Sequence, residues 1–503
     1  MSSNVASGNT SCLRSFRPAR LNTGVSSILV SASRRKMLTT FFCIASAVGA
    51  FAASVHGRDQ FDPSAYAAKD VIERDFAIIG GGAAGTYAAI SLADQNKTFT
   101  LVEVADRLGG NTRTFQDPAT GANVDFGVQI HLDDPIVRNF FARLHAPLTN
   151  VELKDFGLPK YYDFTKRVAL PNYTKGSIQS DYVAELNKYP YVQNLVDLPN
   201  PVPADLLLTW PEYVKKHNLS SGSTEAGLTW PATPGDPLET TALAILNDGN
   251  QIELAEFAGA AIKNANHDNS EIYVNALAEL KAHVLLKSSI VAAQRGLTRK
   301  GGVQLVANTP SGKKLIKAKQ LIIAMPPVLD NTKYFGLDQQ EQAILSKLSG
   351  KHYYGGVVNN TGLKDGIAYT NIGADRPYHV ASLPGVVEIA PSAYPGYQFY
   401  WYNTNQAKTK VEIEAATRST IKWLQTQTNA TALEPKFLDF RDYSPFHLTP
   451  PTKDIAAGWY SKMNGLQGHR NTWYISALFV VGSTQVWNST HNLLPDIINA
   501  ARS

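Results

Sequence analysis

Three glycines in the first quarter of the chain have the type and spacing of a phosphate-binding turn. Gly80, Gly82 and Gly85 form a G-x-G-x-x-G pattern directly after the apolar run 76–79. In this pattern the first glycine makes a tight turn and the second lets the backbone touch a pyrophosphate, while the third lets a helix pack closely on a strand. The chemistry that these residues predict is the binding of a dinucleotide.

The elements around these glycines are those that the motif needs. The run 76–79 stops at glycine and predicts a buried parallel strand. Residues 84–92 predict a helix. The N–H groups at its start, at Ala83 and Ala84, would hold the phosphates with the help of the helix dipole.

Glu103 supplies a second signal for a dinucleotide. It ends a predicted strand over residues 99–102 and lies 18 residues beyond Gly85. A carboxylate at this distance accepts the ribose hydroxyls of an adenosine and would repel a 2′-phosphate. The glycines and the acid together favour a dinucleotide site over an ordinary strand–turn–helix.

The residues after Glu103 indicate which dinucleotide is bound. At intervals of four, six, seven and eleven they are Arg107, Gly109, Gly110 and Thr114. This pattern resembles the R-x-G-G-R-x-x-T extension of the flavoprotein superfamily that includes amine oxidases, polyamine oxidases and phytoene desaturases. The resemblance implies that the extension wraps the diphosphate of FAD, with Arg107 near its oxygens. Asn111, a further candidate contact, departs from the pattern because the family usually has a second arginine there.

Length and charge limit the classes of protein to which this chain can belong. The 503 residues are enough for two or three domains and a sizeable core. The net charge of +5 comes from residues 1–52, which hold six of the 47 basic residues and no acid. The remainder has 41 basic residues against 42 acidic ones, a net charge of −1. We therefore expect a small-molecule substrate and no binding to nucleic acid. The sequence does not indicate an oligomeric state.

Residues 37–52 are expected to be a signal peptide, preceded by an N-terminal extension over residues 1–36. The basic residues 34–36 precede an apolar run, and residues 50–52 fit a cleavage site with small side chains. This layout predicts the secretory pathway and no membrane span after the signal is removed. Two alternatives stay open. The apolar run is kept as a membrane anchor, or the Ser- and Arg-rich extension is a mitochondrial transit peptide.

Cysteine usage limits the chemistry. Both cysteines, Cys12 and Cys43, lie in the leader, so the mature chain has none. This excludes disulfides, thiolate metal sites and a thioether-linked flavin, and we expect FAD to be bound without a covalent link. No cluster of ligand-type residues has the spacing of a metal site, so no metal is predicted. Glycosylation sequons begin at Asn96, Asn172, Asn218, Asn359, Asn429 and Asn488.

The pattern along the mature chain predicts an α/β protein. Residues 178–283 read as mostly helical, including the stretch 239–265, and strands return over residues 287–327. A Rossmann-type FAD-binding domain assembled from three sequence segments, with an inserted α+β substrate domain, accounts for this order. The expected FAD-binding segments are 73–150, 286–330 and 446–503, and the expected substrate-domain segments are 151–285 and 331–445.

The final segment is expected to close the FAD site. Residues 473–481 predict a strand, which leads through Gly482 into an amphipathic helix beginning with Ser483 and Thr484. In the resembled superfamily this turn faces the isoalloxazine, where the helix N-terminus favours the anionic reduced flavin. The same resemblance implies that the strand around Ile290 contacts the adenine through its backbone. A plain C-terminal helix that packs on the sheet is the alternative.

The sequence indicates catalytic residues less clearly than cofactor-binding residues. His131 follows a strand expected to pass close to the cofactor and is the candidate base, with a satisfied loop histidine as the alternative. His447 and His491 are weaker candidates. Tyrosines crowd the stretch 353–402, where they form either an aromatic lining for an apolar substrate or a sheet core. Many amine oxidases of the superfamily carry a lysine where this chain has the glycines 355–356, which argues against simple amine oxidation.

Four motifs together resemble the β-cyclopiazonate dehydrogenase family over about residues 73–500: GGGAAG, E-x-x-x-R-x-G-G-N, A-M-P-P and T-W-Y-x-S-A-L-F…S-T-Q-V-W. The resemblance implies an FAD-dependent oxidoreductase of secondary metabolism. We expect it to take a hydride from a bulky, mostly apolar metabolite, followed by desaturation or oxidative cyclisation. A redox-neutral double-bond isomerase is the second hypothesis. A secreted binding protein that keeps FAD as a structural element is the third.

Overall fold

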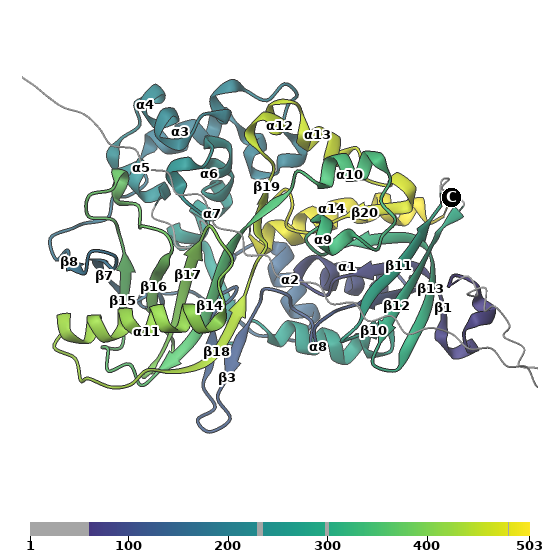
Figure 1. Ribbon diagram of the computed structural model, residues 1–503, viewed down its shortest axis with the longest axis horizontal. Coiled ribbons are helices and arrows are strands. Elements are labelled where there is room, and N and C mark those ends of the chain that lie inside the picture. The colour runs from purple at the N-terminus through teal and green to yellow at the C-terminus, as the bar shows by residue number, and fades with distance from the viewer. Residues whose placement is uncertain (1–59, 229–234, 297–300, 481, 503) are drawn as a thin grey trace, which may run out of the picture. The chain divides into compact units, whose positions relative to one another are not determined.

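The computed structural model describes residues 60–228, 235–296, 301–480 and 482–502 (Figure 1). The extension expected over residues 1–36 and the signal peptide expected over residues 37–52 lie outside this part of the chain. Among the helices that the structure describes, none is both long and apolar enough to cross a membrane.

The first sheet draws its strands from three distant parts of the chain. They are β1 Val71–Ile79, β2 Phe99–Val102, β10 Val284–Leu285, β11 Ser289–Arg295, β12 Val303–Thr309, β13 Gly312–Ile323 and β20 Thr472–Tyr474. In the described residues their order is β10, β2, β1, β13, β12 and β11, and β20 pairs with the end of β13. β11 pairs with β12, and β12 pairs with the first half of β13, both in antiparallel fashion. The other neighbouring strands of this sheet pair in parallel.

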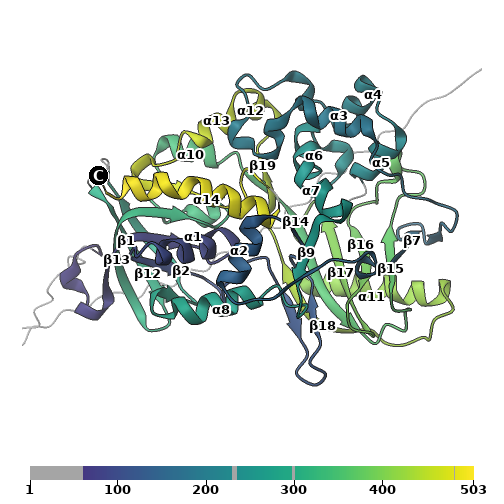
Figure 2. The same cartoon turned by 180° about the vertical axis from the view of Figure 1, so that it is seen from behind.

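Burial explains why the parallel strands are apolar runs. Phe76, Ile78, Leu101 and Ile322 are completely buried, as strands covered on both faces must be. The helices that pack on one another beside this sheet (Figure 2) are α1 Ala83–Asp94, α2 Pro135–Arg143, α8 Glu271–Leu280 and α14 Ser483–Ala500. The carboxyl ends of the parallel strands meet at one edge, where such sheets bind their ligands.

The second sheet lies in the expected substrate domain. Its strands are β7 Leu158–Asp163, β8 Val168–Ala169, β14 Ser349–Asn359, β15 Ile367–Asn371, β16 Gly385–Pro391, β17 Tyr397–Thr404, β18 Lys436–Asp442 and β19 Phe446–Thr449. Their order is β18, β14, β17, β16, β15, β7 and β8, and β19 pairs with β14. The helix α11 (Lys410–Gln427) lies along this sheet (Figure 1), and its Ile413, Ile421 and Leu424 share a core with the strands.

The two faces of β14 have different neighbours. Tyr354 and Val358 belong to the core beneath α11, whereas Val357 packs with Phe126 and Phe399 on the other face. That second face meets a hairpin made of β3 Thr114–Gln116 and β4 Asn123–Asp125. Sheet core therefore explains Tyr354, Tyr369, Tyr400 and Tyr402, whereas Tyr397 bonds to Asp117 and Thr120 beside the hairpin.

The helical stretch expected over residues 239–265 is broken. Two helices, α6 (Ala242–Asp248) and α7 (Gln251–Ala255), replace its first part. The break occurs because the Asn250 side chain accepts the N–H groups that follow it and so caps a new helix. The remaining helices are α3 Ser180–Lys188, α4 Trp210–His217, α5 Ser221–Leu228, α9 Leu329–Thr332, α10 Gln339–Leu345, α12 Thr452–Ala456 and α13 Trp459–Asn464.

The second part of that stretch is not an α-helix. A π-helical turn, η8 (Glu256–Ala260), contains Gly259 with a φ of +109°, which ends the helix. The chain then forms β9 (Ala261–Asn264), where the sequence pattern favours a helix. β9 pairs with β5 (His131–Leu132) and β6 (Leu148–Asn150), so tertiary pairing outweighs local preference here.

The last strand is shorter than expected. The strand predicted over residues 473–481 stops at Tyr474 in the structure, because β13 ends at Ile323 and leaves it no partner further on. Beside each of the expected segment limits at residues 285 and 445, a short strand joins the sheet that belongs to the other side of the limit. β10 joins the first sheet and β19 joins the second, so those limits stay predictions.

Candidate active site

The glycines of the first turn lie against those of the extension at the carboxyl edge of the first sheet. A β-carbon on Gly85 would lie 1.9 Å from the carbonyl oxygen of Gly80. One on Gly110 would lie 2.9 Å from the Cα of Gly82. Gly109 and Gly110 have φ angles of +110° and +53°, which favour glycine. Bare backbone therefore forms the surface here, as a pyrophosphate site requires.

Glu103 holds the neighbouring strand ends together. Its carboxylate is 9% exposed and accepts the N–H of Gly81 at 2.6 Å and that of Ala105 at 2.7 Å. The helix α1 begins beside this point at Ala83 and Ala84. The N–H groups of a helix start and a carboxylate thus lie at adjoining strand ends, the places for phosphate and ribose.

Arg107 is a half-buried cation without a carboxylate partner. Its guanidinium donates to the carbonyl oxygens of Leu108 and Gly110 at 2.8 and 3.1 Å, and in the described ranges no carboxylate forms an ion pair with it. Burial, and then the charges of Arg113 and Arg441, lower the pKa of Arg107 to about 10. Arg107 is therefore still protonated at neutral pH, and the charge of Glu103 offsets only part of the effect of burial and of the two arginines.

Two further arginines reinforce this positive region. Arg113 pairs with Asp439 of β18 at 3.2 Å. Arg441, on the same strand, has a buried Nε that finds no hydrogen-bond partner in the described part of the chain. Asn111, a candidate contact in the sequence, is exposed, whereas Arg441, which no motif indicates, lies near Arg107. An excess of guanidinium groups over carboxylates is suited to an anion such as a diphosphate.

The first turn of α14 is tied to β5. His131 Nδ1 lies 2.7 Å from Ser483 Oγ, and the Leu132 N–H donates to Thr484 Oγ1 at 3.2 Å. The His131 ring stacks on Trp487 and is 1% exposed. Burial lowers the pKa of His131 to about 4, so the imidazole is neutral at physiological pH. These contacts favour a residue that positions Ser483 over a proton acceptor.

Replacing His131 by Gln is expected to make stability less dependent on pH. The wild-type imidazole has an ordinary pKa of 6.5 when unfolded and about 4 when folded. Its contribution is present above pH 6.5 and is lost as the pH falls toward 4. Between these values the wild type should lose roughly 3 kcal/mol more than the variant, as measured by urea unfolding. The exposed His145→Asn variant is the control. Equal losses in the wild type and His131→Gln would show that His131 is not buried as described.

Sequence reasoning missed two acids at the same turn. Glu253 of α7 places its Oε1 2.5 Å from the position of a β-carbon on Gly482. Glu256 is 6% exposed and interacts electrostatically with Glu253. Glutamates three residues apart are common on solvated helix faces, so no motif marks them. Only the tertiary fold brings them against α14.

The other sequence candidates lie in separate surroundings. Ile290 is 6% exposed in β11 and pairs with Ala307, and the register shifts directly after it. His447 of β19 forms an ion pair with Asp248 at 2.5 Å. Of these candidates, only His447 lies near the acids at the first turn of α14, because Asp248 interacts with Glu253.

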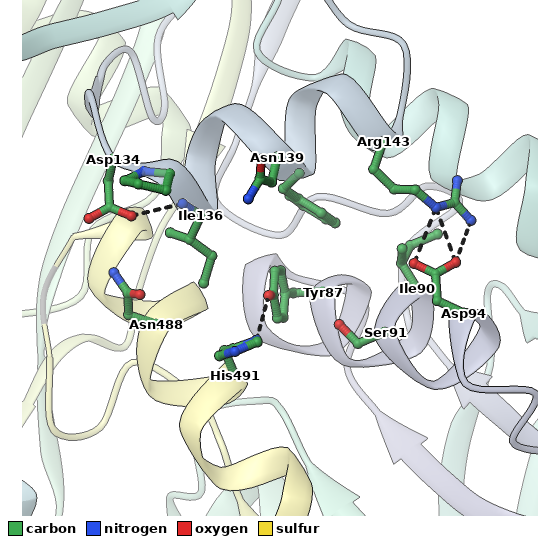
Figure 3. A pocket seen from close by; sticks show the side chains of 12 residues that line it. Tyr87, Ile90, Ser91, Asp94, Asp134, Ile136, Asn139, Arg143, Asn488 and His491 are labelled. Atoms are coloured by element: carbon green, nitrogen blue, oxygen red, sulfur yellow. Dashed lines mark hydrogen bonds and ion pairs between the residues drawn. The ribbon is translucent and has the colours of Figure 1, made fainter.

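Figure 3 shows the surroundings of His491, in a cleft of about 460 Å³ between α1, α2 and α14. Its Nδ1 lies 3.1 Å from the Tyr87 hydroxyl, and Arg143 pairs with Asp94 across the same cleft. His491 is eight residues beyond Ser483, about 12 Å along the helix. It therefore does not reach the turn that holds Ser483.

One group of ligand-type residues lies outside this site. Asp338, Glu341 and His469 offer oxygen and nitrogen atoms within 4.8 Å of one another. Arg295 already binds both oxygens of Glu341 at 2.6 Å, and Arg470 lies 3.3 Å from the same carboxylate. A metal cation would have to displace these guanidinium groups, so the cluster is suited to a structural ion pair.

Comparison with known proteins decides the family. A sequence profile of the NAD(P)-binding Rossmann-like domain matches residues 78–144. The FAD-dependent oxidoreductase dbaF of Emericella nidulans is 48% identical over 455 residues, which cover 90% of this chain and 97% of that protein. The chain belongs to the FAD-dependent oxidoreductases. Beta-cyclopiazonate dehydrogenase of Aspergillus oryzae is 28% identical over 448 residues, 86% of this chain and 95% of that protein, which confirms the expected resemblance.

A solved structure confirms the fold of this FAD-dependent oxidoreductase. The CLA-producing fatty acid isomerase from P. acnes superposes with a TM-score of 0.64 and 18% identity, covering 84% of this chain and 98% of that one. At this identity the likeness concerns the fold alone. The expected Rossmann-type FAD-binding domain and α/β class are confirmed.

The residues at the carboxyl edge fit the cofactor of the family. The Arg107 guanidinium and the Arg441 Nε, which finds no hydrogen-bond partner in the described part of the chain, match an anionic diphosphate. The bare backbone at Gly82 and Gly110 allows close approach, and the Glu103 carboxylate is placed for a ribose. When bound, FAD supplies a two-electron oxidant that accepts hydride.

Proposed function

We propose that this enzyme takes a hydride from an activated C–H bond of a bulky, mostly apolar metabolite of secondary metabolism. Desaturation or oxidative cyclisation of that metabolite follows. The observation that supports this proposal best is the face of β14 that meets the FAD-binding segment, because it carries aromatic side chains around a glycine.

Gly355 is the centre of this face. A β-carbon on it would lie 3.0 Å from Tyr443 Cε2 and 3.3 Å from Trp401 Cδ1. Tyr443 and Trp401 both donate to the Phe126 carbonyl, at 2.9 and 3.3 Å, and so join the second sheet to the residue that follows the β3–β4 hairpin. Tyr353 packs on Tyr443 with ring centroids 5.6 Å apart. An aromatic wall of this kind favours an apolar substrate.

The same geometry disfavours amine oxidation. Many amine oxidases that the chain resembles carry a lysine on this strand, but a side chain at Gly355 would crowd the rings of Tyr443 and Trp401. The name of the dehydrogenase relative from Aspergillus oryzae supports removal of hydrogen. These chain residues would orient an apolar molecule and exclude water, and the cofactor would supply the chemistry.

A metabolite comparison tests this function. Strains with and without a working gene are extracted, and the compounds that differ are identified by mass. The expected result is a compound that accumulates in the deletion strain and carries two hydrogen atoms more than the missing product. The accumulated compound should also bleach the purified oxidised enzyme without oxygen. Loss of nitrogen from the product would favour an amine oxidase instead.

The same compounds distinguish the proposed dehydrogenase from the second hypothesis, a redox-neutral isomerase. A redox-neutral isomerase would give an accumulated compound and a missing product of equal mass, and it would turn over many times without an electron acceptor. The proposed dehydrogenase should stop after one turnover per FAD under these conditions. If no accumulated compound bleaches the flavin, the reading of FAD as a structural element is favoured.

A further inference from the structure

Two glutamates face the first turn of α14 from α7 and η8. Glu253 and Glu256 are three residues apart in a continuous helical stretch, so their side chains share one face. The Glu253 Oε1 lies 2.5 Å from the place of a β-carbon on Gly482. The Leu132 N–H donates to Thr484 Oγ1 and also lowers the pKa of the Glu256 carboxyl against the rise that burial causes. Both carboxyls therefore lie at the N-terminus of α14.

Glu256 is buried and Glu253 is half-buried. In the described ranges no Lys, Arg or His forms an ion pair with either glutamate. Burial raises the pKa of Glu256 to about 7. Burial, and then the charges of Glu256 and Asp248, raise the pKa of Glu253 well above its ordinary value. Both groups therefore bind a proton more readily than exposed glutamates do.

Asp248, His447 and His131 are the further titratable groups around the pair. Asp248 at the end of α6 forms an ion pair with His447 of β19. Burial lowers the pKa of His447 and Asp248 raises it, with a net rise, while Lys351 of β14 opposes that rise. His131 on β5 is the other titratable group at this turn, and it is neutral. Asp248 acts on Glu253 through its charge, so the ion pair with His447 tunes how readily Glu253 holds a proton.

A neighbouring amide indicates a bound molecule at this place. Gln485 is 3% exposed, and its Oε1 accepts the Gly482 N–H and so caps α14. The same oxygen lies 3.0 Å from the point that Glu253 approaches. Its Nε2 has no hydrogen-bond partner in the described part of the chain. The side chain that lies beside the Glu253 carboxyl thus carries a buried donor without a partner, as a polar group on a ligand would require.

A purely structural role does not explain the pair. Gln485 already caps α14, so Glu253 is not needed for that purpose. Buried acids without a counter-charge cost stability, and structural acids are normally paired. Titratable groups with strongly raised pKa values cluster at functional sites.

We propose that Glu253 and Glu256 share a proton and accept the proton that the substrate loses during its oxidation. This inference rests on the proposed dehydrogenation. One substrate C–H bond breaks and its electron pair leaves with the hydrogen as hydride, for which oxidised FAD is the acceptor. A neighbouring C–H, N–H or O–H bond releases its proton to the Glu253 carboxylate. The electron pair of that bond then forms the new double bond, or the new ring bond.

The pH dependence of stability tests the pair without a substrate. Because the folded pKa values are raised, the stability contributed by the pair is present at low pH and lost as the pH rises through about 7. The melting temperature of Glu256→Gln holoenzyme should match the wild type near about pH 5 and exceed it near about pH 8.5. Glu239→Gln, at an exposed position, is the matched control and should show no such difference. A constant offset at both pH values would overturn the proposal.

The spectrum of bound FAD gives a second test. In the wild type, the flavin absorbance should change with an apparent pKa near 7, because an isoalloxazine bound at the N-terminus of α14 would lie beside a charge that changes. Glu256→Gln should lose this transition while keeping its FAD. A transition that persists in both Glu253→Gln and Glu256→Gln would overturn the proposal, and so would loss of FAD from both variants at every pH.

The rate of flavin reduction tests the role in catalysis. With the compound that accumulates in the deletion strain, Glu253→Gln should be reduced about a hundredfold more slowly or worse, as expected for loss of a base. Glu253→Asp, which keeps a carboxyl, should recover part of the rate. A wild-type rate and pH profile in Glu253→Gln would overturn the proposal. If no compound reduces the wild type, the proposed function fails, while the spectral and melting tests still decide whether the pair shares a proton.

Discussion

A Gly85→Ala enzyme is expected to be purified without FAD and with greatly reduced stability. The added methyl group would lie 1.9 Å from the carbonyl oxygen of Gly80. That oxygen belongs to backbone that cannot move easily, because the Gly80 N–H is bonded to the Val102 carbonyl at 2.9 Å. Separating helix and strand costs more than about 3 kcal/mol. If all of this free energy is lost from FAD binding, the affinity for FAD drops more than about a hundredfold.

The ratio of flavin to protein absorbance and the melting temperature measure both effects. Gly385→Ala is the matched control, since its new β-carbon would meet nothing closer than 3.4 Å. The control should keep FAD and melt like the wild type. A yellow Gly85→Ala protein with normal melting would mean that α1 does not pack on β1 as closely as described.

An Arg107→Met enzyme is expected to bind FAD weakly while its apoprotein stays as stable as the wild type. Arg107 has no carboxylate partner in the described residues and lies in the field of Arg113 and Arg441. Removing the cation takes away an anchor for the diphosphate, which costs about 3 kcal/mol or roughly a hundredfold in Kd. In the apoprotein the same change removes a half-buried, repelled charge, so the melting temperature should not fall.

Titration of apoprotein with FAD and melting of both forms separate these effects. Arg138→Met is the control, because Arg138 is an exposed partner of Asp133 and should affect neither quantity. A structural role for Arg107 would lower the melting temperature of the apoprotein as well. An unchanged Kd in Arg107→Met would contradict the assignment of this region to the diphosphate.

Motifs with fixed spacing predicted the first sheet and its edge. Gly80, Gly82, Gly85 and Glu103 act through local backbone geometry, so their roles can be read from short-range spacing. The same holds for α14, whose start after Gly482 is found as expected. In each case the determining contacts lie within one βαβ unit or one turn.

Long-range pairing explains what the sequence could not predict. Residues 261–264 have a helical pattern but complete a sheet with β5 and β6. Arg441 and Glu253 reach the site from segments whose distance in sequence hides their proximity in space. The sequence pointed to His131. The turn of α14 that contacts His131 also lies beside Glu253 and Glu256, which no motif marks.

The most direct test of the account is the release of cofactor from the purified wild-type protein. The protein is denatured by heat, and the flavin in the soluble fraction is identified and compared with the amount of chain. We expect a yellow protein that releases one FAD per chain into solution. A colourless protein that does not take up FAD when it is supplied would contradict the account.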